Sequence, residues 1–303
     1  FLPWFICMLG ALFYAYEYLL RITPSVMRDD LVRHFHIEST QFGNLSAFYY
    51  YIYTPMQLFV GVLMDRYGPR RLLTMATLSC VIGSILFAAT GDFSVAAMAR
   101  LLIGFGSAFA FVGVLKLATI WLPNRYFAMF SGLATALGMI GAIAGVLLMT
   151  KMVEMLGWQE TIYISGIIGI FIALLIGLFV RDHGHDRKKA LSTQTNSLSD
   201  AVKGLLKISV APQMWIVGLI GCMLYLPISA FAELWGIPYL EQGQSLNPEA
   251  SAFAVTMIFW GWVIGGPLSG WLSDYMKRRV IPLAVMPIFA IIAISFVLYQ
   301  PHL

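Results

Sequence analysis

The amino-acid sequence predicts an all-α, polytopic membrane protein, and three observations favour that class. Hydrophobic residues fill 59% of the 303 positions and charged residues only 11%, whereas a soluble domain carries about 25% charged residues. The apolar residues gather in runs of about 20, the length a helix needs to cross a bilayer. These runs are too long, and alternate too little, for the strands of a membrane barrel. A net charge of +4 gives no support for nucleic-acid binding.

Nine apolar runs are predicted to span the membrane. They cover residues 4–26, 41–64, 71–90, 95–121, 127–149, 160–180, 212–238, 249–273 and 280–299. One long connection, 181–211, is charged at its start and then rich in Ser, Thr, Asn and Gln. We therefore expect a six-helix bundle over 1–180, a cytoplasmic interdomain loop over 181–211, and a partial second bundle of three helices over 212–303.

The basic residues predict which loops face the cytoplasm. Thirteen of the nineteen Lys and Arg residues fall in one set of connections, and three fall in the alternate set. Cytoplasmic loops carry the excess of Lys and Arg in most membrane proteins. This rule places the N-terminus in the cytoplasm. We expect a multi-pass protein of the plasma membrane, which in a bacterium is the inner membrane. An organelle membrane would give the same pattern.

A short motif occurs twice, at matching places in the two hydrophobic halves. The second predicted span ends in Gly61-Val-Leu-Met-Asp65-Arg66-Tyr-Gly68-Pro-Arg70-Arg71, and the eighth ends in Gly270-Trp-Leu-Ser-Asp274-Tyr-Met-Lys-Arg278-Arg279. A shift of 209 residues superimposes one copy on the other. A repeat of this kind indicates a duplicated bundle.

The first copy resembles the signature loop of the major facilitator superfamily (MFS), and the second fits the weaker repeat of that loop. Arg100-x-x-x-Gly104-x-Gly106 is similar to the second motif of the family. The resemblance implies the MFS fold, two pseudo-symmetric six-helix bundles that normally hold twelve spans. This chain then carries about nine of them, and it is expected to lack the last three. The family's secondary transporters work by alternating access.

The signature loops are expected to act as a cytoplasmic latch between the two halves. Asp65 can accept charge-assisted hydrogen bonds from arginine or from a helix N-terminus, and Gly61 can let another helix approach closely. The alternative is that the arginines anchor the loop to anionic lipid. The residues assigned to this latch are Gly61, Asp65, Arg66, Gly68, Arg70 and Arg71, with Gly270, Asp274, Arg278 and Arg279 in the second copy.

Ionisable residues within spans mark the candidate substrate pathway, because they are costly in a bilayer and are a functional hypothesis by default. In the first span Tyr14, Glu17, Tyr18 and Arg21 share one helix face. Tyr14 and Tyr18 are expected to bind substrate together with Arg21. Glu17 and Arg21 are four residues apart and are expected to pair. The pair is interpreted as a substrate-binding arginine beside a titratable carboxylate, or alternatively as an ion pair that locks this span to a neighbour.

Other spans add further candidates. Tyr50, Tyr53 and Gln57 are expected to bind substrate from the second span. From their positions along their spans, Arg100 and Arg21 are expected to lie at a similar depth in the membrane, and two arginines at one depth are suited to bind a carboxylate or phosphate. An equal alternative for Arg100 is that it orders the helix bundle. Glu233 lies near the end of the seventh span, which Pro227 interrupts. It is assigned with Glu17 to proton coupling, with an outer gate or a plain interface position as alternatives.

Tyr18-Leu-Leu-Arg21 resembles the pattern of the anion:cation symporter branch, although Leu20 and Ser107 stand where that branch often has acids. The resemblance implies a secondary active transporter of a small, anionic organic solute, by proton-coupled symport. The alternatives are a drug or metabolite exporter that works by proton antiport and a non-transporting sensor on the same fold. Without metal, nucleotide or nucleophile motifs, we expect no enzyme activity, cofactor or metal. The expected partners are the solute, protons and lipid, and the protein is expected to be a monomer.

Overall fold

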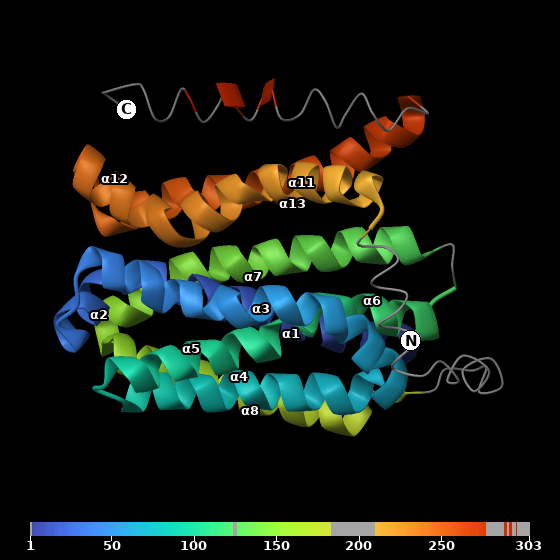
Figure 1. Cartoon of the computed structure of the whole chain (residues 1–303), viewed down its shortest axis with the longest axis horizontal. Coiled ribbons are helices and arrows are strands. Elements are labelled where there is room, and N and C mark those ends of the chain that lie inside the picture. The colour runs from blue at the N-terminus through green and yellow to red at the C-terminus, as the bar shows by residue number, and fades with distance from the viewer. Residues whose placement is uncertain are drawn as a thin grey trace.

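The computed structural model describes residues 2–123, 126–182 and 210–276, together with 288, 289, 291, 292 and 295. Every regular element in these residues is a helix. Six helical segments of this part are long and apolar enough to cross a membrane by length and composition. Figure 1 shows the helices side by side along the long axis of the molecule. The predicted all-α membrane fold is confirmed.

The first six predicted spans form helices close to their expected bounds. They are α1 (Leu2–Val26), α3 (Ser39–Tyr67), α4 (Pro69–Ala89), α5 (Phe93–Ser107) with α6 (Ala110–Trp121), α7 (Phe127–Leu156) and α8 (Trp158–Phe179). The fourth span was predicted as one helix, but a turn at 108–109 divides it into α5 and α6. A short polar helix, α2 (Arg28–Phe35), joins the first two spans. Hydrophobicity does not predict it, because it lies outside the apolar runs.

The seventh predicted span contains three successive segments, α11 (Pro212–Leu226), the π-helix η2 (Pro227–Trp235) and α12 (Gly236–Gln244). Pro227 lacks the N–H that an α-helix would need at this position, so the helical pattern changes there. π-Helical segments are rare and are frequently found at functional sites. The eighth span is α13 (Pro248–Met276).

Part of the predicted pattern falls beyond these elements. Residues 183–209 of the interdomain loop and most of the ninth span, 280–299, lie outside the described residues. In the second signature copy, Gly270 and Asp274 lie in the last part of α13, and Arg278 and Arg279 lie outside the described residues.

The site is positioned by close packing around α1, which contacts α6, α7 and α8. In Figure 1, α13 lies on one side of α7, and the layer of α4, α5 and α8 lies on the other. Two glycines set the spacing of the innermost helices. A Cβ on Gly141 would sit 2.2 Å from the carbonyl oxygen of Ala15, and a Cβ on Gly104 would sit 2.2 Å from that of Tyr49. Backbone therefore meets backbone at α7–α1 and α5–α3, as expected for small residues in membrane helices.

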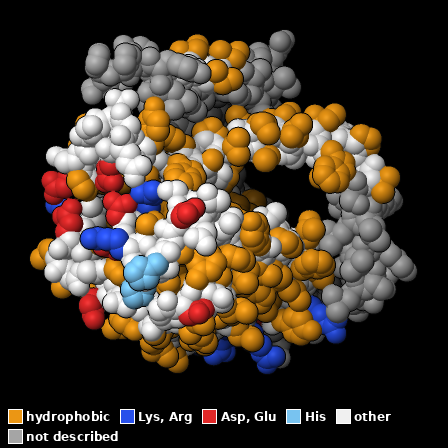
Figure 2. All heavy atoms as spheres, turned by 60° about the vertical axis from the view of Figure 1, so that its left-hand side comes forward, with side chains coloured by type: hydrophobic (Ala, Val, Ile, Leu, Met, Phe, Trp, Pro, Cys, Tyr) orange, Lys and Arg blue, Asp and Glu red, His pale blue; other side chains and the backbone are white. Residues whose placement is uncertain are grey.

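The outer surface fits a lipid environment. Figure 2 shows hydrophobic side chains over much of the visible face, with charged side chains gathered mainly toward one side. On α8, Ile167, Phe171, Leu174 and Leu178 are each more than half exposed. A continuous apolar surface of this kind is not stable in water but is the normal outer face of a membrane helix.

Candidate functional site

Four charged side chains are buried among the described residues, and all four were singled out from the sequence. They are Glu17 and Arg21 on α1, Arg100 on α5 and Glu233 on η2. None of them is more than 5% exposed. An unpaired charge is costly in a low-dielectric interior, so each of these four side chains needs a partner, and the partners determine which ligands the site can bind.

Glu17 and Arg21 form the expected pair along α1. The Nε and Nη2 atoms of Arg21 lie 2.9 Å and 2.5 Å from the Oε1 atom of Glu17. The hydroxyl of Tyr49 donates to the same carboxylate oxygen and accepts a hydrogen bond of 3.2 Å from Arg21 Nε. The predicted pairing is confirmed. The second oxygen of Glu17, Oε2, has no hydrogen-bond partner among the described residues.

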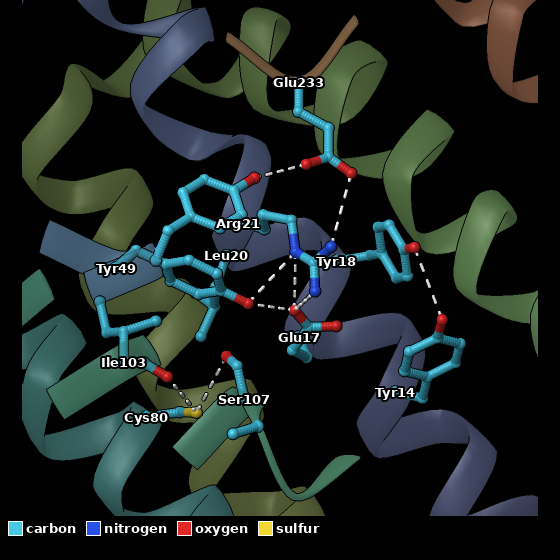
Figure 3. A network of polar contacts seen from close by, with 12 residues as sticks. Tyr14, Glu17, Tyr18, Leu20, Arg21, Tyr49, Cys80, Ile103, Ser107 and Glu233 are labelled. Carbon is cyan, nitrogen blue, oxygen red and sulfur yellow. Dashed lines mark hydrogen bonds and ion pairs between the residues drawn. The ribbon is translucent and has the colours of Figure 1, made fainter. Parts of the chain in front are cut away.

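Arg21 also reaches the second half of the chain. Its Nη1 atom donates to the hydroxyl of Tyr225 at 2.8 Å and lies 3.6 Å from Oε1 of Glu233. Both oxygens of Glu233 are held by tyrosines, Oε1 by Tyr225 at 2.9 Å and Oε2 by Tyr50 at 2.6 Å. Figure 3 shows the guanidinium of Arg21 between the carboxylates of Glu17 and Glu233. Two carboxylates from distant parts of the chain therefore share one guanidinium.

A cavity of about 410 Å³ opens beside Arg21. The residues that line it are Tyr14, Tyr18, Arg21, Tyr50, Tyr53, Thr54, Gln57, Phe111, Tyr225 and Ser229. Six of the seven residues that the sequence assigns to substrate are in this lining. The carbon at the centre of the Arg21 guanidinium lies 4.5 Å from the ring centroid of Tyr18 and 4.9 Å from that of Tyr53. Such cation–π contacts hold the guanidinium at the cavity wall.

Arg100 is the exception, because it does not line the cavity in this structure. Its Nη1 donates to the carbonyl oxygen of Leu20 at 3.3 Å, and its guanidinium carbon lies 5.2 Å from the ring centroid of Tyr49. The side chain turns toward the backbone of α1, and its Nε has no partner among the described residues. This geometry fits the alternative role, in which Arg100 ties α5 to α1 and orders the bundle.

The first signature loop makes contacts that the sequence did not specify. Among the described residues Asp65 forms its ion pair, of 2.5 Å, with Lys116 of α6 and not with an arginine. Gly61 was expected to let another helix approach closely, and no described helix does so. No atom of a described neighbour would lie within 4 Å of a Cβ added at Gly61. The guanidinium of Arg66 lies 5.5 Å from the ring centroid of Tyr67, and Arg71 is exposed.

Arg70 and Asp182 cap two helix ends at once. The backbone N–H of Arg70, at the start of α4, donates to Oδ1 of Asp182 at 2.7 Å. The guanidinium of Arg70 donates to the carbonyl oxygen of Gly177, near the end of α8, at 2.6 Å and 2.9 Å. Gly68 has φ of +80°, and a Cβ there would lie 2.7 Å from the Asp182 carboxylate. The loop is thereby fixed to the end of α8, a contact that favours glycine at position 68.

Two residues of the network were missed by the sequence reasoning. Tyr49 lies in the aromatic run 48–53, and the run alone did not show which of its tyrosines turn inward. Tyr225 lies two residues before Pro227, and the break in the helix was the available signal. Because polar residues near discontinuous helices often line transporter sites, this signal was sufficient to nominate Tyr225.

The comparisons with known proteins agree on one family. A model of the Major Facilitator Superfamily matches residues 6–302. The chain is 22% identical to the probable sulfoacetate transporter SauU of Cupriavidus necator, over 88% of this chain and 64% of that protein. It is 25% identical to the hexuronate transporter of Bacillus subtilis, over 91% of this chain and 64% of that protein. The chain thus spans about two thirds of the length of these relatives.

A solved structure shows the same fold. The crystal structure of a bacterial homologue of the human lysosomal transporter Spinster, in an inward-facing and occupied conformation, matches with a TM-score of 0.71. The match covers 99% of this chain and 68% of that chain at 14% identity. At this identity the likeness shows the arrangement of the helices and nothing about a ligand.

Proposed function

Since the chain belongs to the Major Facilitator Superfamily, we propose that it forms most of a secondary active transporter that moves a small organic anion by alternating access. One observation carries the proposal. Arg21, a permanently charged group, is buried at the wall of the central cavity. A guanidinium in such a place is well suited to bind an oxyanion through charge-assisted hydrogen bonds. The names of the two relatives, which refer to sulfoacetate and hexuronate, support an anionic solute.

The cavity favours a solute that carries hydroxyl groups as well as an anion. Its volume lies in the range of small-molecule sites. Apart from Arg21, its polar lining is made of hydroxyl and amide groups from tyrosines, Thr54, Gln57 and Ser229. These groups donate and accept hydrogen bonds without adding charge. A hydroxylated carboxylate of sugar-acid size fits this chemistry.

We propose that transport is coupled to protons through one of the two carboxylates beside Arg21, Glu17 or Glu233. Both contact the guanidinium that is expected to bind the solute, so a proton on either one changes how strongly Arg21 attracts an anion. The two halves, residues 1–180 and 212–303, would rock about this cluster, with the interdomain loop between them.

The proposed orientation places the N-terminus in the cytoplasm of a monomer in the bacterial inner membrane. On α1 and α3 the cavity extends from Arg21 and Tyr50 toward Tyr14 and Gln57, and so toward that side. At the opposite end, Phe42 and Trp235 close the gap between the halves, with ring centroids 6.1 Å apart. The state described is therefore inward-facing in this orientation.

Uptake into proteoliposomes tests the proposal. Labelled D-glucuronate and sulfoacetate are compared with neutral D-xylose, with and without an inward proton gradient. We expect uptake of an anion, stimulation by the gradient and no uptake of xylose. Arg21→Ala should lower anion uptake at least about 30-fold, because a charge-assisted hydrogen-bonded pair of about 2 kcal/mol is lost.

The matched control is Arg33→Ala, which removes an arginine whose side chain is 77% exposed, and it should transport like the wild type. Uptake by Arg21→Ala at the wild-type rate would refute the assignment of the site. Stimulation by an outward instead of an inward proton gradient would favour the exporter. No transport in either direction would favour the sensor.

A further inference from the structure

Arg21 offers no unoccupied edge to an incoming anion in this structure. A guanidinium has five N–H donors in a fixed fork. The edge formed by Nε and Nη2 is taken by Oε1 of Glu17. The remaining nitrogen, Nη1, faces the hydroxyl of Tyr225 and the carboxylate of Glu233. A substrate carboxylate can therefore pair with Arg21 only after one of these carboxylates has moved away.

The two carboxylates differ in their freedom to leave. Glu17 is one turn from Arg21 on the same helix, and Tyr49 also donates to it, so it moves with Arg21 as one body. Glu233 belongs to η2 and meets Arg21 only across the contact between α1 and η2. Any rocking of the later helices against α1 separates Glu233 from Arg21 and leaves Glu17 in place.

The buried charges set a second condition. The four buried charged side chains are two arginines and two glutamates, so their formal charges cancel. A bound monoanion would add one uncompensated negative charge, which costs several kcal/mol in a buried site. One proton on a carboxylate of the cluster restores neutrality. The carboxylate that leaves Arg21 is the one that loses its positive partner, so it is the one that must take the proton.

We infer that Glu233 is a built-in competitor for the substrate on Arg21, and that the substrate carboxylate replaces it when Glu233 takes up one proton. This inference rests on the proposed function and assigns its coupling residue. The proton enters from the cavity and stays on the Glu233 carboxyl, hydrogen bonded to its tyrosines, while Glu17 remains the charged partner of Arg21. Each monoanion is then accompanied by one proton, and the loaded cluster is neutral.

The groups that face Glu233 come from three helices. They are Arg21, Glu17 and Tyr18 of α1, Tyr50 and Tyr53 of α3, and Tyr225 of α11. From α12 and α13, the described Tyr239, Glu241 and Glu249 make no hydrogen bond or ion pair with it. Arg21 is therefore the one positive group in contact with Glu233 in the described part of the chain, and its occupation by substrate is what changes the charge around Glu233.

The test compares the variant Glu233→Gln with two control variants. Glutamine keeps the shape and the tyrosine contacts but cannot take up a proton. Glu233→Asp keeps the acid, and Glu241→Gln removes a neighbouring acid on α12 that does not contact Arg21. Each protein is reconstituted, and the apparent Kd for D-glucuronate or sulfoacetate, whichever the wild type transports, is measured at about pH 6 and about pH 8. Uptake is also measured under an imposed potassium-diffusion potential.

We expect the wild-type Kd to rise about 10-fold for each pH unit, and so about 100-fold over this range, because each bound anion takes up one proton. Its uptake of D-glucuronate, a monoanion at these pH values, should not respond to the potential, because one proton accompanies each anion. Sulfoacetate carries two negative charges at these pH values, so its uptake with one proton should carry one net negative charge. Glu233→Gln should bind with a Kd that changes by less than about 2-fold. It should still exchange anion for anion across the membrane, and any net uptake of anion by this variant should respond to the potential, because no proton accompanies it. Glu233→Asp and Glu241→Gln should behave like the wild type.

Three results would overturn the inference. The first is wild-type pH dependence and electroneutral uptake in Glu233→Gln. The second is loss of pH dependence in Glu17→Gln alone, which would place the proton on Glu17 and leave the proposed function intact. The third result concerns the case in which Glu233→Gln does not exchange anion at all. Glu233→Asp is then the deciding variant, and pH-independent anion binding by Glu233→Asp would overturn the inference. A wild type that neither binds nor transports either anion contradicts the proposed function itself, and the inference falls with it.

Discussion

Gly104 is the point at which α5 presses on the part of α3 that carries Tyr49, and alanine there should disturb the charge network without removing a charge. The added Cβ would lie 2.2 Å from the carbonyl oxygen of Tyr49, whereas carbon and oxygen in contact are about 3.3 Å apart. The two helices must separate by about 1 Å. Overpacking of this kind costs about 1–3 kcal/mol. The hydroxyl of Tyr49, which donates to Glu17, moves with the helix.

We therefore expect Gly104→Ala to lower the Tm of the detergent-purified protein, by about 2–4 °C for each kcal/mol lost, and to weaken anion binding. Thermal unfolding followed by intrinsic fluorescence measures the first effect, and the Kd of the transported anion measures the second. Gly61→Ala is the matched control on α3, because no described atom lies within 4 Å of its added Cβ. Alanine also favours the helix by about 1 kcal/mol. An unchanged Tm in Gly104→Ala, or an equal loss in Gly61→Ala, would refute the reasoning.

Two further predictions concern the signature loop. Gly68→Ala should destabilise the protein by about 1–3 kcal/mol, because the residue sits at φ of +80° and the new Cβ displaces Asp182; a double-mutant cycle with Asp182→Ala, measured by Tm, should recover part of the loss, and strict additivity would contradict the contact. Asp65 and Lys116 are 64% and 33% exposed, so removing either should cost less than about 1 kcal/mol. The charge swap Asp65→Lys with Lys116→Asp should restore whatever uptake the single changes lose, and a swap as slow as the single variants would refute a role for the pair.

The parts of the site that were predicted from the sequence follow from local geometry. A helix repeats every 3.6 residues, so residues that share a face can be identified without knowledge of the fold. This rule placed Tyr14, Tyr18 and Arg21 at one wall of the cavity and paired Arg21 with Glu17. The helices themselves followed from the length of the apolar runs, because a bilayer requires about 20 apolar residues for each span.

The parts that were not predicted depend on how helices pack against each other. Arg100 counts to the same height as Arg21, but height does not fix the direction of the side chain, and the packing of α5 on α3 turned it toward Leu20. The break at Pro227 was visible in the sequence. The π-helix that follows determines which side chains point to the interior. In this arrangement the hydroxyl of Tyr225 donates a hydrogen bond to the carboxylate of Glu233.

Two ion pairs join different helices in the described part of the chain, and they differ in what they can do for transport. The pair between Asp65 and Lys116 is partly exposed, and exposed pairs contribute about 1 kcal/mol or less. Moving a two-state equilibrium from one extreme to the other requires about 5.5 kcal/mol, so this pair alone cannot switch the protein. The pair between Arg21 and Glu233 is at most 3% exposed, and removing one partner of such a pair costs about 3–5 kcal/mol. An anion that replaces Glu233 on Arg21 therefore acts on the one contact of the two that is strong enough to bias the halves, whereas the signature loop can only adjust the balance.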